Sequence, residues 1–106
     1  MALESIFKRK TRKKIEAMFP GCIILKNDAG YVQGIPDMLI LFNNRWAMLE
    51  FKKEEDAKKQ VNQDYYIDLL NRMSYASFID PENEEQILNE LQHALKPERI
   101  TRFSRR

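Results

Sequence analysis

The chain has 106 residues, which is enough for one domain with one modest core, and its 43% of hydrophobic residues excludes a wholly disordered protein. No apolar run approaches the ~20 residues of a membrane-spanning helix, and the N-terminal residues show no secretory signal pattern. A single cysteine, Cys22, excludes an intrachain disulfide and a cysteine-based zinc site. We therefore expect a cytoplasmic protein without a membrane partner (in the host cytoplasm if the chain is viral).

The net charge of +2 is small, but basic residues gather at both ends of the chain. Residues 8–14 read KRKTRKK, and a second cluster comprises Lys96, Arg99, Arg102, Arg105 and Arg106. Clusters of this kind on a near-neutral chain suggest a polyanionic partner. The alternative is a solvated helix face and a solvated tail.

The first predicted element is a helix from Leu3 to Met18, because apolar residues recur there at spacings of three, four and their sums. Pro20-Gly21 ends it. The short, β-branched run Cys22–Lys26 predicts a strand. Residues 27–30 (NDAG) and 34–36 (GIP) are typical of turns, so a loop should follow this strand.

Two further strands, Asp37–Phe42 and Trp46–Lys52, flank the tight turn 43–45 and predict an antiparallel hairpin. A helix from Lys59 to Met73 should follow. Its expected inner face comprises Val61, Tyr65, Leu69, Leu70 and Met73.

The chain should continue with a short strand, Ala76–Ile79, and a last helix. Asp80 is expected to cap this helix, with Pro81 in its first position. Its predicted buried stripe comprises Ile87, Leu88, Leu91 and Leu95. The order α-β-β-β-α-β-α predicts an α/β fold in which one mixed sheet is flanked by helices.

Three polar side chains are expected to meet at one end of the hairpin. Side chains alternate between the faces of a strand, so Glu50 and Lys52 share one face while Phe51 points the other way. Asp37 begins the preceding strand, which places it beside the end of the next one. Two close carboxylates repel each other, and a bound cation removes this repulsion.

Carboxylate oxygens suit Mg²⁺ or Mn²⁺, and a metal of this kind activates water and stabilises charge on a phosphate. Lys52 would then orient the water or stabilise the transition state. The alternative is a surface pair, Glu50–Lys52, with Asp37 as an ordinary turn residue.

Gly34-Ile35-Pro36-Asp37, followed after twelve residues by Glu50-Phe51-Lys52, resembles the PD-(D/E)xK nuclease superfamily. Within it, the chain resembles the virus-type replication-repair (VRR-NUC) nucleases. Three further matches are Glu4 in the first helix, Lys26 in the first strand and Gln63 at the start of the central helix. The resemblance extends from Glu4 to Leu95 and implies a restriction-endonuclease-like core, with residues 1–96 as the nuclease domain and residues 97–106 as a basic C-terminal tail.

The resemblance also implies roles for these residues. Asp37, Glu50 and the main-chain carbonyl of Phe51 would bind the metal, and Lys52 would be the catalytic lysine. Glu4 and Gln63 would be auxiliary groups at the site, and hydrolysis would leave a 5′-phosphate. Two departures are Phe51, where a small β-branched residue is more usual, and Met73-Ser74, where a glycine is often found.

The basic residues expected to contact DNA are Lys10, Lys13, Lys14 and Lys26. The predicted function is therefore a metal-dependent DNA endonuclease, with branched or junction DNA in viral or phage replication, recombination or repair as one class of substrate. Two alternatives remain open: a non-catalytic nucleic-acid-binding protein and a subunit of a larger DNA-processing complex. Cutting both strands of a duplex with one centre per chain would need a homodimer.

Overall fold

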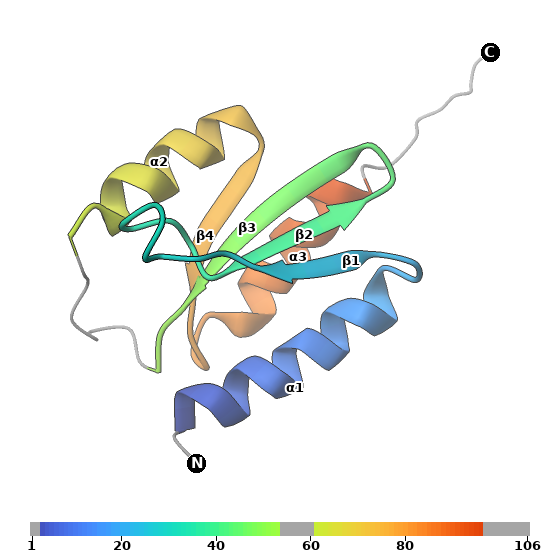
Figure 1. The fold of residues 1–106 in the computed structure, drawn as a ribbon. Coiled ribbons are helices and arrows are strands. Elements are labelled where there is room, and N and C mark those ends of the chain that lie inside the picture. The colour runs from blue at the N-terminus through green and yellow to red at the C-terminus, as the bar shows by residue number, and fades with distance from the viewer. Residues whose placement is uncertain (1–2, 54–60, 97–106) are drawn as a thin grey trace.

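A computed structural model describes the backbone of residues 3–53 and 61–96, with side chains from residue 6 onward in these ranges. The described residues form, in order, α1 (Leu3–Met18), β1 (Ile23–Lys26), β2 (Met38–Phe42), β3 (Arg45–Phe51), α2 (Gln63–Met73), β4 (Tyr75–Ile79) and α3 (Glu84–Leu95) (Figure 1). The strands form one sheet in the order β1-β2-β3-β4, with β1, β2 and β3 antiparallel and β4 parallel to β3. The predicted α/β class, element order and mixed sheet are confirmed.

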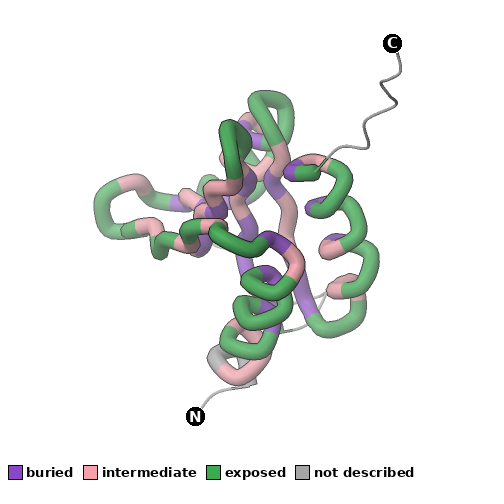
Figure 2. Tube along the Cα trace, turned by 90° about the vertical axis from the view of Figure 1, so that its right-hand side faces the viewer, coloured by how far each residue is buried: buried purple, intermediate pink, exposed green. Residues whose placement is uncertain are grey.

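Helices α1 and α3 contribute to one hydrophobic core together with the strands. The core residues are Ile15, Phe19, Met38, Ile40, Ala47, Leu49, Phe51, Ile79, Ile87, Leu91 and Leu95. Figure 2 shows the buried positions following the strands, while the outer faces of the helices are exposed. Glu84 of α3 joins the two helices, because it accepts hydrogen bonds from Thr11 (2.9 Å) and Lys14 (3.1 Å) of α1.

Helix α2 begins later than predicted and presents a different face to the protein. Lys59 lies outside the described residues, but residues 61–62 form a turn and the helix begins at Gln63. Three of the side chains expected to face inward are 61–65% exposed: Val61, Tyr65 and Met73. The buried residues of the helix are Gln63 and Leu70. The spacing of apolar residues did not predict this buried face, because the first buried residue of the helix, Gln63, is polar.

The prediction that the last helix begins at Pro81 is wrong, since α3 begins at Glu84. Asp80 nevertheless accepts hydrogen bonds from the main-chain N–H groups of Glu82 (2.8 Å) and Asn83 (2.9 Å). The Asn83 side chain accepts one from the N–H of Asp80 (2.8 Å) in return. This reciprocal pairing closes a turn before the helix.

The strand boundaries differ from the predicted ranges by one residue at one or both ends, a difference within the usual scatter of such assignments. Among the described residues, no helix has both the length and the apolar character needed to cross a membrane. The predicted basic tail, residues 97–106, lies outside the described residues.

Candidate active site

The β2–β3 hairpin places Asp37 beside Glu50. Met38 pairs with Leu49 in the antiparallel register, so the residues just beyond this pair are neighbours at the same end of the two strands. The main-chain N–H of Asp37 donates to Glu50 Oε1 (3.1 Å), and the N–H of Phe51 donates to Asp37 Oδ2 (3.3 Å). Each carboxylate is therefore held by the backbone of the opposite strand, as the predicted juxtaposition requires.

The loop between β1 and β2 is closed by Asn27. Its main-chain N–H donates to the carbonyl of Asp37 (2.8 Å), and its side-chain amide donates to the carbonyl of Pro36 (2.9 Å). Gly34 has φ +93°, and a Cβ at this position would lie 2.6 Å from the Cβ of Asn62. Only glycine fits here without strain, so the loop packs closely against the residue preceding α2.

Gln63 links the two charged side chains at the end of β3. Its Nε2 donates to Glu50 Oε2 (2.9 Å), and its Oε1 accepts from Lys52 Nζ (2.8 Å). All three side chains are buried, with Glu50 6%, Lys52 9% and Gln63 5% exposed. Phe51 points to the opposite face, where its ring makes an edge contact with Phe7 of α1. The predicted alternation along β3 is confirmed, and Gln63 lies on the face that carries Glu50 and Lys52.

Burial and the nearby charge of Asp37 raise the pKa of Glu50 to about 7. The positive charges of Lys52 and Lys8 and the hydrogen bond from the Asp37 N–H act in the opposite direction, but they are outweighed. A pKa near neutrality means that the charged form of Glu50 is poorly stabilised by the protein alone. A cation bound between the two carboxylates would supply the missing stabilisation.

The oxygen atoms at this site fit a hard divalent cation that takes few of its ligands from the protein. Among the side chains that the structure describes (residues 6–53 and 61–96), no group of three or more His, Cys, Asp or Glu gathers in a metal-binding arrangement. The candidate set among these residues is the carboxylate pair Asp37 and Glu50, with the carbonyl of Phe51 as a main-chain oxygen. Mg²⁺ usually keeps several waters and takes one or two carboxylates from the protein, so this set is sufficient.

A groove of about 380 Å³ opens beside Asp37, between α1 and the edge of the sheet. It is lined by Lys8, Arg9, Arg12, Ile24, Leu25, Lys26, Asp37 and Met38. Lys26 therefore lies beside the site, as the prediction requires. Lys8 forms an ion pair with the aspartate of the site, since its Nζ lies 3.3 Å from Asp37 Oδ2.

Three of the basic residues expected to contact DNA do not line this groove. Lys10 and Lys13 are exposed elsewhere on α1, and Lys14 pairs with Glu84 of α3. The rotation of α1 is set by Phe7, Thr11 and Ile15, which are one turn apart and face the protein.

Lys8, Arg9 and Arg12 were missed by sequence reasoning. Thr11 is fully buried one turn from both Phe7 and Ile15, so apolar spacing places it on the inward face, but this spacing does not show which basic residues on either side of that face reach Asp37. One signal was present: Lys8 follows Glu4 by one helical turn, and Glu4 was already expected at the site. Glu4 lies in the first turn of α1, but its side chain lies outside the described residues, so its role stays a prediction.

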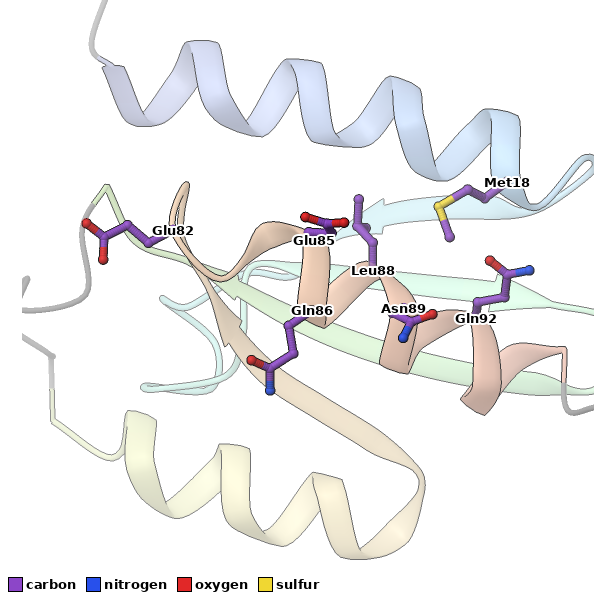
Figure 3. Close-up of a pocket in the computed structure, with 7 residues that line it drawn as sticks. All are labelled: Met18, Glu82, Glu85, Gln86, Leu88, Asn89 and Gln92. Atoms are coloured by element: carbon purple, nitrogen blue, oxygen red, sulfur yellow. The ribbon is translucent and has the colours of Figure 1, made fainter.

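A second, larger open groove of about 680 Å³ lies between α1 and α3 (Figure 3). Its lining is acidic, amide or apolar, and comprises Met18, Glu82, Glu85, Gln86, Leu88, Asn89 and Gln92. Without a basic side chain among the described residues that line it, this groove is unsuited to phosphate. The groove beside Asp37 is the better candidate for a polyanionic ligand.

Comparison of the chain with protein-family models, curated proteins and solved structures found no match in any of the three. The function of the chain is therefore inferred from its residues and their geometry.

Proposed function

We propose that this protein is a Mg²⁺- or Mn²⁺-dependent DNA endonuclease that hydrolyses phosphodiester bonds at the site formed by Asp37, Glu50 and Lys52. One observation supports the proposal above the others. Two carboxylates are fixed next to each other by reciprocal hydrogen bonds to the backbone, and Gln63 joins one of them to a buried lysine.

Each residue has a role that follows from its position. Asp37 and Glu50 would hold the metal, and the carbonyl of Phe51 would complete the protein ligands. When bound, the metal supplies a more acidic water and positive charge for the phosphate. Lys52 would stabilise negative charge that develops on the phosphate. Gln63 keeps both the lysine and the glutamate in place through its amide.

The raised pKa of Glu50 favours this function over a binding module. A protein that only binds DNA gains nothing from a buried carboxylate that repels its neighbour and would repel phosphate as well. A metal-binding function accounts for both carboxylates, because the ion neutralises them and attracts the phosphate.

The test is incubation of the protein with linear, flapped and four-way DNA, with Mg²⁺, with Mn²⁺ and with EDTA. We expect cleavage of at least one substrate with either metal and none with EDTA. Cleavage that persists in EDTA would contradict the proposed mechanism. An absence of cleavage of every DNA with both metals would contradict the proposed activity.

A further inference from the structure

Lys8 forms an ion pair with one of the two carboxylates proposed to bind the metal. Its Nζ lies 3.3 Å from Asp37 Oδ2, the same oxygen that accepts the N–H of Phe51. The ammonium group also lies 5.5 Å from the centre of the Phe51 ring. The Lys8 side chain is 34% exposed, so it can leave this position without opening the core.

A divalent cation on Asp37 and the Lys8 ammonium cannot both keep these positions at low cost. Like charges a few ångströms apart repel each other strongly in a partly buried site. Lys8 therefore provides positive charge for Asp37 in the metal-free protein and competes with the metal for the same carboxylate. Binding of the metal should displace the ammonium group.

The groove offers the displaced ammonium a second place to act. Arg9, Arg12 and Lys26 line it along with Lys8, and Asp37 is its only acidic lining residue among those the structure describes. Its apolar lining residues are Ile24, Leu25 and Met38. A concentration of positive charge over an apolar surface suits a sugar-phosphate backbone. The volume of about 380 Å³ is near the lower end for ligand pockets, ~300–1,000 Å³, so it suits a short piece of one strand better than a duplex.

We propose that Lys8 pairs with Asp37 until the metal binds, and then binds a phosphate of a single nucleic-acid strand in this groove. The proposal rests on the proposed function, because the groove is lined by Asp37, one of the two carboxylates proposed to bind the metal. It assigns to Lys8, Arg9, Arg12 and Lys26 the phosphate contacts next to the cleaved bond.

The first measurement is Mn²⁺ binding to the full chain by calorimetry, without DNA. Lys8→Met keeps a long, unbranched side chain and removes the charge, so its Mn²⁺ affinity should rise by about threefold or more, as loss of a competing ion pair implies. The control is Arg72→Met, which also removes a cation paired with an aspartate, Asp68, outside the groove. Its Mn²⁺ affinity should remain that of the parent. If Lys8→Met does not fold, Lys8→Gln replaces it.

The second measurement is binding of a single-stranded oligonucleotide in Ca²⁺ across a salt series. Loss of one phosphate contact should lower the slope of log affinity against log salt by about 0.7 in the Lys8 variant. Parental Mn²⁺ affinity in the Lys8 variant, or a parental salt slope, would overturn the proposal. If the parent cleaves DNA and binds Mn²⁺ while the Lys8 variant matches it in both measurements, only the Lys8 proposal fails. If the parent binds no Mn²⁺, the proposed function fails with it.

Discussion

Replacing Glu50 with glutamine should stabilise the metal-free protein at alkaline pH. The folded protein raises the pKa of this carboxyl from 4.5 to about 7, first through burial and then through the charge of Asp37. Between these two values the folded state binds more protons than the unfolded state, so stability falls as the pH rises through this window. Glutamine has no charge to lose, so the variant should not show this decline.

The size of the effect follows from the shift. A change from 4.5 to about 7 corresponds to at most about 3 kcal/mol of destabilisation once Glu50 is fully ionised. Glutamine keeps an oxygen for the N–H of Asp37, but its amide group competes with the donor from Gln63, which costs about 1 kcal/mol. The net gain above pH 8 should therefore be about 1–2 kcal/mol.

The assay is urea denaturation in EDTA at several pH values from 4.5 to 8.5. We expect the variant to be equal to the parent or slightly less stable at the acidic end and more stable at the alkaline end. Glu85→Gln makes the same chemical change at an exposed position of α3 and should follow the parental profile. A stability difference between Glu50→Gln and the parent that does not change with pH would refute the reasoning.

Three further predictions concern residues around the carboxylates. Lys52→Ala should lower the single-turnover cleavage rate by about 100-fold or more with little change in DNA affinity. The control Lys53→Ala, at an exposed position, should not lower this rate, and equal losses of rate in the two variants would contradict the role assigned to Lys52. Gln63→Ala should lower the free energy of unfolding by about 1–3 kcal/mol, because it removes the buried hydrogen bonds to Glu50 and from Lys52; an unchanged urea midpoint would contradict the bonding described. Gly34→Ala should cost about 1–3 kcal/mol through its positive φ and close packing, and should be more destabilising than Gly30→Ala in thermal unfolding.

The carboxylate pair could be predicted from the sequence because its geometry depends on local rules. A tight turn fixes the hairpin, so the start of one strand must lie beside the end of the next, and alternation along the second strand fixes the face of each side chain. Asp37, Glu50 and Lys52 follow from these two rules. Gln63 could be included in the predicted site only through the family resemblance, since the spacing of apolar residues does not identify a buried polar residue.

The basic groove could not be predicted, because it depends on where α1 lies against the sheet. Six basic residues surround Thr11, and the apolar residues Phe7 and Ile15 place this threonine on the inward face, but they do not show which basic residues beside that face meet the edge of the sheet. The hydrogen bond from Thr11 to Glu84, 73 residues away, stabilises this orientation. Long-range contacts of this kind decide which lysines reach Asp37 and which reach α3.

The most direct test of the central claim is cleavage by Asp37→Asn in Mg²⁺, measured under single-turnover conditions on whichever DNA the parent cuts. Asparagine preserves the size of the side chain and an oxygen that can accept the N–H of Phe51, so the variant should fold like the parent. Because the metal loses one of its two carboxylates, the cleavage rate should fall by about 100-fold or more. Cleavage by the folded variant at the parental rate would show that Asp37 does not hold the catalytic metal.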